Sequence, residues 1–309
     1  MLLTLSASCL KSLVLPAGRG KKPQLDLLEL PAFTKGTLGL GGMNLSTDLL
    51  VGADRARLDI VRERTDKAGC SCLLLVEADS QKFGDKSAAV AAAATERMRR
   101  VVEAAHILGC SAAAVRITAE DDDESLATVA QRLKPVVERA ERLDLNLLIS
   151  PGPGLTSRPE RVTELLKKIG GFRIGTFPDF QTASSAKDPA AYLHRITPYA
   201  TVVSASTVKL VSQGARKARK GEAPPPDEFA HEPYSLKTMV DAIAAVGYDG
   251  PLAIDYRGEG DPVAGVAASR LALLSALGEH PADLAREEDE LAGEEEVGEE
   301  VEEAGEDEA

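Results

Sequence analysis

The chain has 309 residues, of which 44% are hydrophobic, and its formal net charge at pH 7 is −13. The negative charge is concentrated in residues 281–309, where 15 acidic residues accompany one basic residue, so residues 1–280 are close to neutral. A near-neutral folding unit with 4% aromatic residues and no Trp argues against a nucleic-acid-binding protein, and no apolar run reaches the roughly 18 residues of a membrane span.

Short apolar runs alternate with longer amphipathic stretches from the N-terminus to residue 277. The runs predict eight strands: Leu2–Ala7, Gly42–Leu45, Cys72–Val76, Ala112–Ile117, Leu145–Ile149, Arg173–Phe177, Thr201–Ala205 and Leu252–Tyr256. The stretches predict eight helices: Leu25–Leu38, Ala53–Lys67, Ser87–Leu108, Ser125–Leu143, Pro159–Ile169, Pro189–Ile196, Ser235–Val246 and Asp261–Leu277. Regular alternation of this kind predicts a parallel sheet, because parallel strands need crossover connections.

Eight strand–helix units favour closure into one α/β domain, a (β/α)8 TIM barrel, which we place at residues 1–278. Strands rich in Val, Ile and Leu without clean alternation fit a sheet that is covered by helices on one side and filled on the other. An open doubly wound sheet is the alternative. No G-x-G-x-x-G motif opens a helix after a strand, which disfavours a dinucleotide-binding version of that fold.

Two segments fall outside the predicted barrel elements. Residues 279–309 are Glu-rich with almost no large apolar side chains, so we predict a disordered acidic tail that could bind a basic partner. The segment Lys209–Pro233 is predicted to be a long loop, with five basic residues between Lys209 and Lys220. Barrels often bind phosphate in the loops after strands seven and eight, so this loop is a candidate anion site. A solvated loop attracted to the acidic tail is the alternative.

The N-terminus argues against export, and the cysteines argue against a metal site. Met1–Pro16 is apolar but has no basic residue before Lys11, so we expect no export signal and a cytoplasmic protein. Of the four cysteines, Cys70 and Cys72 are two residues apart, a spacing that places both on one face of a strand. No second Cys or His cluster follows at metal-ligand spacing, so buried, reduced thiols are preferred to a metal site.

The working face of such a barrel is the carboxyl end of its strands, so the polar residues after each run are the candidates for a site. No histidine lies there and no G-x-S-x-G turn is present, which argues against a His base and a Ser nucleophile. The predicted catalytic residues are three carboxylates, Glu77, Asp179 and Asp255. The predicted ligand-binding residues are Asn44, Arg116, Ser150, Gln181, Ser204, Ser206 and Arg257.

The three carboxylates allow two interpretations. Oxygen ligands from Glu77, Asp179 and Asp255, completed by water, could hold Mg²⁺ or Mn²⁺. Alternatively, each carboxylate pairs with Arg116 or Arg257, or faces water at a strand end.

Three stretches resemble the xylose isomerase-like barrel family, which includes sugar phosphate isomerases, epimerases and related lyases. Gly247–Gly258, followed by Gly-Asp-Pro, resembles the family's closing pattern G-Y-D-G-x-h-x-I-E-x-x-G…D-P, in which h is apolar. Pro153–Glu160 with Ile174–Phe180 resembles E-x-H-G-G-L-T-S-x-P-E…G-h-x-x-D-x, and Leu108–Arg116 resembles L-G-x-x-x-V-R. The stretches stand in the family's order and cover about residues 2–277.

The resemblance implies one divalent metal, held by Glu, Asp, His and Glu at the ends of strands five to eight. The corresponding residues here are Ser150, Asp179, Ser204 and Asp255, so that one ligand is unchanged and one is a shortened carboxylate. Other polar positions of the family pattern fall on Asn44, Gly152 and Ser206. Serine hydroxyls are poor replacements for anionic or imidazole donors, so the resemblance supports the fold more than the activity.

Two functions therefore remain open. The first is a catalytically degraded barrel that keeps a small sugar-like ligand and holds no metal or only a weakly bound Mn²⁺ or Mg²⁺. The second is an active, metal-dependent sugar or sugar phosphate isomerase or epimerase with a rearranged centre that uses Asp179, Asp255 and Glu77. An unrelated lyase or hydrolase is a third reading. The sequence gives no indication of an oligomeric state.

Overall fold

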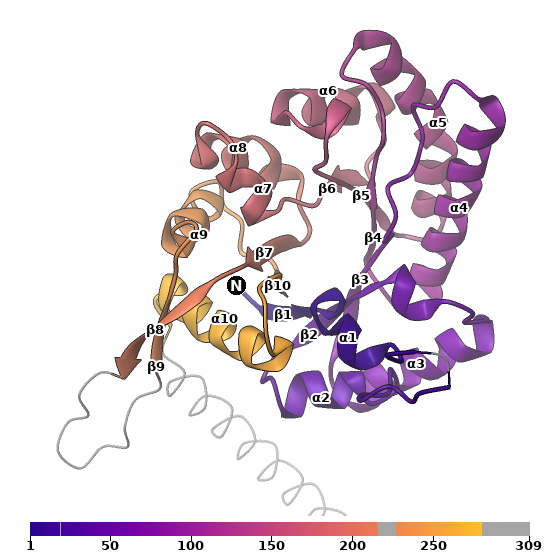
Figure 1. Ribbon diagram of the computed structural model, residues 1–309. Coiled ribbons are helices and arrows are strands. Elements are labelled where there is room, and N and C mark those ends of the chain that lie inside the picture. Colours follow the sequence, from indigo (N-terminus) through magenta and orange to yellow (C-terminus); the bar gives the residue numbers. More distant parts are fainter. Residues whose placement is uncertain (19, 216–226, 280–309) are drawn as a thin grey trace, which may run out of the picture.

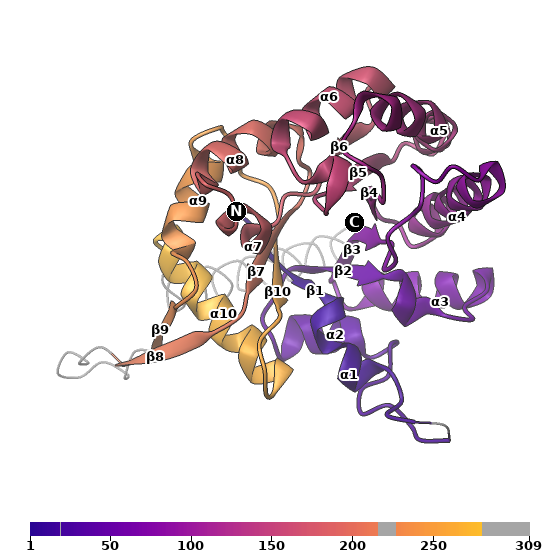
Figure 2. The same cartoon turned by 45° about the horizontal axis from the view of Figure 1, so that its top comes forward.

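The computed structural model describes residues 1–18, 20–215 and 227–279. Eight parallel strands curl around a common axis with helices on the outside (Figures 1 and 2). The strands of this sheet are β1 (Leu3–Ser6), β2 (Gly42–Ser46), β3 (Ser71–Val76), β4 (Ala112–Arg116), β5 (Asn146–Ser150), β6 (Ile174–Thr176), β7 (Val203–Thr207) and β10 (Leu252–Tyr256). The predicted TIM barrel is confirmed.

The strand order is β6-β5-β4-β3-β2-β1-β10-β7, which leaves β6 and β7 at the two edges. Isolated parallel bridges, Thr176 with Ala200 and Asp179 with Ser204, join these edges. The backbone N–H of Ser204 also donates to the carbonyl of Pro178 at 2.8 Å. The edges therefore meet, and the open doubly wound sheet is excluded. The same bridge brings Asp179 beside β7.

Ten α-helices are found in the described part of the chain: α1 (Lys11–Val14), α2 (Leu30–Gly36), α3 (Arg55–Lys67), α4 (Ala88–Ile107), α5 (Asp123–Arg142), α6 (Pro159–Ile169), α7 (Phe180–Ser184), α8 (Pro189–Ile196), α9 (Leu236–Ala244) and α10 (Pro262–Leu277). Short 3-10 helices are η1 (Ala7–Leu10), η2 (Thr47–Leu50), η3 (Gly154–Thr156) and η4 (Thr197–Tyr199). None of the helices in the described ranges is long and apolar enough to cross a membrane.

The core has two layers because successive residues of a strand point to opposite faces of the sheet. One face packs on the helices in a large cluster, to which β4 contributes Ala113 and Val115. The other face fills the barrel with a small cluster of mostly short side chains: Leu74, Ala112, Ala114, Leu148, Val202 and Ala253. Val76 and Phe177 pack against this inner cluster and close it toward the carboxyl ends of the strands.

The predicted helix Leu25–Leu38 is wrong in its extent, because only Leu30–Gly36 is helical. The carboxylate of Asp26 accepts a hydrogen bond from the N–H of Leu28 at 2.9 Å, which forms a turn before the helix. Pro31 then lies in the first turn, where its missing N–H costs nothing.

The predicted loop Lys209–Pro233 is also wrong in part, because it contains an antiparallel hairpin of β8 (Leu210–Ala215) and β9 (Asp227–His231) that extends from the barrel (Figure 1). Lys209 pairs with Glu232 at 2.5 Å. The other basic residues of the predicted anion site, at 216–220, lie outside the described residues, as do residues 280–309 of the predicted acidic tail.

The predicted burial of the cysteines is confirmed for three of the four. Cys70, Cys72 and Cys110 are buried and free of disulfides. Cys72 contacts Cys110, with the two sulfur atoms 3.3 Å apart. The contact therefore joins β3 to the turn before β4.

Candidate ligand-binding site

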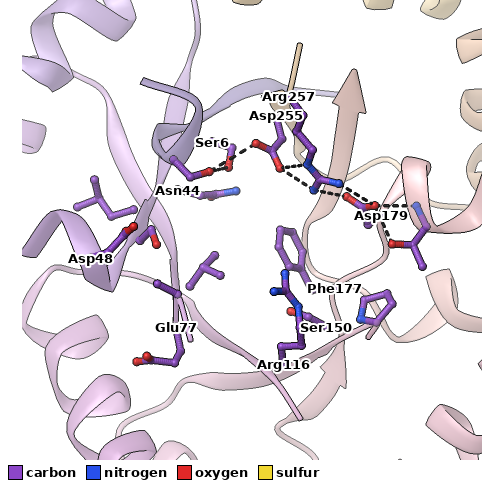
Figure 3. Close-up of a pocket in the computed structure, with 17 residues that line it drawn as sticks. Ser6, Asn44, Asp48, Glu77, Arg116, Ser150, Phe177, Asp179, Asp255 and Arg257 are labelled. Atoms are coloured by element: carbon purple, nitrogen blue, oxygen red, sulfur yellow. Dashed lines mark hydrogen bonds and ion pairs between the residues drawn. The ribbon is translucent and has the colours of Figure 1, made fainter. Parts of the chain in front are cut away.

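A cavity of about 240 Å³ opens at the carboxyl ends of the strands (Figure 3). This volume is slightly below the ~300–1,000 Å³ of typical ligand pockets, so the cavity suits a small ligand. Its polar and charged lining residues are Ser6, Ser8, Asn44, Ser46, Asp48, Glu77, Arg116, Ser150, Asp179, Thr182, Asp255 and Arg257. Val76 and Phe177 close it toward the inner core.

Strand alternation explains most of this lining. Ala112 and Ala114 of β4 face the barrel interior, so Arg116, two residues on, faces the cavity above them. By the same count Leu148 leads to Ser150, and Ala253 leads to Asp255. The polar residues that line the cavity therefore continue the inner face of the barrel beyond its apolar filling.

The centre of the charged wall is an arginine between two aspartates (Figure 3). Nη2 of Arg257 lies 2.6 Å from Oδ2 of Asp179 and 2.7 Å from Oδ2 of Asp255. Nε donates to the same oxygen of Asp255 at 2.9 Å. The Asp179 side chain is 9% exposed and that of Asp255 is 15% exposed, so both carboxylates are taken out of bulk water.

Asp179 is fixed from three directions. As the N-cap of α7, it accepts hydrogen bonds from the N–H and the hydroxyl of Thr182, at 2.8 and 2.9 Å. The hydroxyl of Ser204 donates to its other oxygen at 2.9 Å. Side-chain oxygens are the preferred N-cap groups because they satisfy the free N–H groups of the first turn. One carboxylate therefore caps a helix, joins β6 to β7 and holds Arg257.

The two carboxyl groups respond differently to this setting. Burial favours a higher pKa at Asp179, but the charge of Arg257 and the hydrogen bonds outweigh burial and hold the pKa of Asp179 below its usual value. At Asp255, burial and the neighbouring charge of Asp179 outweigh Arg257, and the pKa is raised. Asp255 is therefore the group of this pair whose charge is more easily lost on acidification.

Glu77 does not join this pair. Alternation already predicts its direction, because Leu74 and Val76 face inward and Glu77 is the next residue. Its carboxylate accepts a hydrogen bond from Nε of Arg97 on α4 at 2.8 Å, and Figure 3 shows it directed away from the cavity centre. The predicted convergence of the three carboxylates is thus limited to Asp179 and Asp255.

Asn44 and Arg116 are cavity side chains whose polar groups have no partner in the described part of the chain. Asn44 is 2% exposed, and neither its Nδ2 nor its Oδ1 makes a hydrogen bond there. The guanidinium of Arg116 forms no hydrogen bond or ion pair with any described residue. Gly152 makes room for the stem of Arg116, since a Cβ at position 152 would lie 3.0 Å from Cγ of Arg116. These two groups are available to a ligand.

The remaining predicted residues, Gln181, Ser204 and Ser206, support the wall and do not line the cavity. Ser206 accepts a hydrogen bond from the N–H of Gln181 at 2.8 Å, and the side chain of Gln181 accepts one from Nη1 of Arg257 at 2.8 Å. The hydroxyl of Tyr234, which follows the hairpin, donates to the carbonyl of Ser206. Phe177 and Thr182 line the cavity but were not predicted; alternation along the sixth strand would have identified Phe177.

A family model described as a xylose isomerase-like TIM barrel matches residues 37–277. The chain belongs to this family. No curated protein is similar enough in sequence to match.

Solved structures show the same fold at low identity. The 3-keto-D-glucoside 4-epimerase of E. coli is 13% identical, with 89% of this chain and 99% of that chain covered and a TM-score of 0.66. An L-ribulose 3-epimerase is 14% identical, with 92% and 97% covered and a TM-score of 0.69. The IOLI protein, described with a bound zinc atom, is 9% identical, with 89% and 98% covered and a TM-score of 0.66.

The metal implied by this xylose isomerase-like family can be tested against the residues present. At the four implied ligand positions, Ser150 and Ser204 offer hydroxyls, and Arg257 fills the space between Asp179 and Asp255. Across the described ranges, no three His, Cys, Asp or Glu side chains gather in a way that could hold a metal ion. With Arg257 in this position, the residues do not fit a divalent cation.

Proposed function

We propose that this barrel binds a small, sugar-type ligand in the cavity at the carboxyl ends of its strands. Asn44 carries the proposal. A buried amide without partners costs roughly 1–3 kcal/mol, so such groups are rare unless something satisfies them. An amide offers both N–H donors and an acceptor oxygen, which match the hydroxyl groups of a polyol.

The rest of the cavity supports the same ligand class. Oδ1 of Asp255 accepts one long hydrogen bond, from Ser8 at 3.4 Å, and can accept another from a ligand hydroxyl. Arg116 has five free N–H donors in a flat fork, which suits a phosphate or carboxylate substituent. A sugar phosphate can therefore use Arg116 at one side of the cavity and Asn44 with Asp255 at the other.

Membership of the family and the names of the similar structures support a sugar over other polyhydroxylated ligands. Those structures include an epimerase of a 3-keto-D-glucoside and one of L-ribulose. The active isomerase or epimerase remains a second candidate, favoured by the convergence of Asp179 and Asp255. Turnover distinguishes the two candidates. An epimerase inverts the configuration at one carbon of its ligand and an isomerase moves the carbonyl group of its ligand, whereas a binding protein releases the ligand unchanged.

The test is a thermal-unfolding and calorimetric survey of monosaccharides, their phosphates and sugar acids, with and without Mn²⁺. A ligand at ~100 times its Kd should stabilise the protein by about 2.7 kcal/mol. NMR in D₂O on the binding sugars then reports any exchange or epimer formation. If no sugar, sugar phosphate or sugar acid binds, the proposed function is wrong.

A matched pair of variants locates the ligand. Asn44→Leu removes the unsatisfied amide, so it should abolish ligand binding without lowering the stability of the free protein. Asn146→Leu changes the same residue type at the start of β5, the opposite end of the barrel, and should leave ligand affinity unchanged. Equal loss of affinity in both variants would place the ligand elsewhere.

A further inference from the structure

We propose that Arg257 is a built-in cation that takes the place of the family's divalent metal, and that Asp179 and Asp255 form a latent divalent-cation site which Arg257 keeps closed. This inference deepens the proposed function and rests on it, because both concern the same cavity. The observation behind it is the position of one guanidinium between two buried carboxylates.

The hydrogen bonds of Arg257 account for every donor it has. A guanidinium carries five N–H groups. Nε donates to Asp255, Nη2 donates to Asp255 and Asp179, and Nη1 donates to Asp179 at 3.3 Å and to Gln181 at 2.8 Å. No N–H is left for a ligand. The role of Arg257 is therefore to neutralise and orient the carboxylates, as a bound cation would, and it is a positioning residue.

The oxygen atoms of the carboxylates show what this arrangement leaves open. Both oxygens of Asp179 are used by Thr182, Ser204 and Arg257. Oδ2 of Asp255 accepts two hydrogen bonds from Arg257, whereas Oδ1 accepts only the 3.4 Å bond from Ser8. Arg257 therefore fixes Asp255 with one oxygen directed to a ligand hydroxyl.

The local chain explains why the arginine points this way. The N–H of Arg257 donates to the carbonyl of Thr207 at 2.7 Å, which extends the pairing of β10 with β7 by one residue. At the next residue, Gly258, a Cβ would lie 2.1 Å from the carbonyl oxygen of Val208, so the chain can turn there only as glycine. This close turn against β7 holds Arg257 on the side of Asp179.

Binding of Mn²⁺ to the full chain tests the proposal, with titration calorimetry and thermal unfolding after treatment with EDTA. Arg257→Ser and Arg257→Gln open the site, Arg257→Lys keeps a positive charge in it, and Arg142→Ser is a control at an exposed arginine of α5. Residues 281–309 carry 15 acidic residues and can themselves bind Mn²⁺ weakly. Only binding that Asp179→Asn removes is therefore counted.

We expect no Asp179-dependent Mn²⁺ binding in the wild type, in Arg257→Lys or in Arg142→Ser. Arg257→Ser should bind one Mn²⁺ per chain, with a rise in melting temperature on the order of 5 °C at ~100 times the Kd, and should lose it when combined with Asp179→Asn. If Arg257→Ser does not fold, Arg257→Gln replaces it as the variant that opens the site. We expect it to bind one Mn²⁺ per chain with the same rise in melting temperature.

Two results overturn the proposal. One is stoichiometric Mn²⁺ binding by the wild type that Asp179→Asn abolishes, since the metal then displaces Arg257. The other is a folded opening variant that binds no Mn²⁺. Neither result decides the proposed function, because the metal titration contains no sugar and the ligand survey is carried out both with and without metal.

Discussion

Replacing Asp179 by Asn tests how much the charge of this residue contributes to the stability of the fold. Asn keeps the size of the side chain and its ability to cap α7, because Asn is as good an N-cap residue as Asp. It removes the negative charge that faces Arg257 at 2.6 and 3.3 Å, and it weakens the hydrogen bond that Ser204 donates. The substitution therefore isolates the electrostatic contribution of Asp179.

The size of the effect follows from burial. Removing one partner of a fully buried ion pair costs about 3–5 kcal/mol. Asp179 is 9% exposed, but Arg257 is 36% exposed and keeps Asp255 as a partner, so solvent screens part of the loss. We expect Asp179→Asn to lower the free energy of unfolding by about 2–3 kcal/mol at pH 7.

The direction of the pKa shift at Asp179 determines how this loss of stability changes with pH. The pKa of Asp179 is lower in the folded protein than in the unfolded chain, where it is about 3.9. The stability that its charge contributes is therefore present above pH ~4 and is lost as the pH falls through the folded pKa. The difference in stability between wild type and Asp179→Asn should be constant from pH 6 to pH 8 and should shrink below pH ~4.

Urea unfolding followed by circular dichroism at pH 8, 6 and 3.5 measures this difference. Asp188→Asn is the matched control, because Asp188 caps α8 by accepting from the N–H of Ala191 at 3.0 Å and has no arginine partner among the described residues. Asp188→Asn should change the free energy of unfolding by no more than about 0.5 kcal/mol. The reasoning is refuted if both substitutions cost the same, or if the loss at Asp179 is undiminished at pH 3.5.

Two further predictions concern packing and hydrogen bonding around the site. Gly84→Ala should lower the free energy of unfolding by about 1–3 kcal/mol, because the new Cβ would lie 2.5 Å from the Cβ of Ala119. Gly36→Ala, in α2 with open space around it, should raise the free energy of unfolding by about 0.5–1 kcal/mol. Urea midpoints that move in the same direction for both variants would contradict this prediction. Tyr234→Phe removes a part-buried hydrogen bond to the carbonyl of Ser206 on β7 and should lower the free energy of unfolding by about 1 kcal/mol. Tyr199→Phe, at an exposed tyrosine, should change it by nothing measurable. Equal unfolding curves for the two variants would show that the Tyr234 hydrogen bond does not stabilise β7.

The barrel could be predicted because its signal is repeated eight times. Each apolar run is short, each amphipathic stretch is long enough for a crossover helix, and one misplaced boundary changes nothing in the count. The hairpin β8–β9 was missed for the opposite reason. It occurs once, its strands contain Gly214 and charged residues, and its pairing is held by contacts such as the N–H of Val208 donating to Nε2 of His231 at 2.9 Å, which no periodicity encodes.

The location of the candidate site could be predicted, but only some of the residues that form it could be. Asn44, Arg116, Ser150 and Asp255 stand at strand ends with the inward alternation of their strands, and all four line the cavity. Glu77 stands one residue out of that alternation, so it borders the cavity but its carboxylate pairs with Arg97. Strand alternation, applied at each strand end, would have separated these two groups without a structure.

The behaviour of Arg257 could not be predicted in this way, because it depends on side chains from a loop, a helix and a strand at once. Its donors need Asp179 after β6, Asp255 on β10 and the amide of Gln181 on α7, which are brought together only when β6 meets β7. Ser204 contributes by being short, since its hydroxyl reaches Asp179 without filling the space of the guanidinium. The serines in place of longer ligands and the arginine between the aspartates therefore form one consistent set. Restoring a single ligand, for example by Ser204→His, should not create a metal site while Arg257 remains.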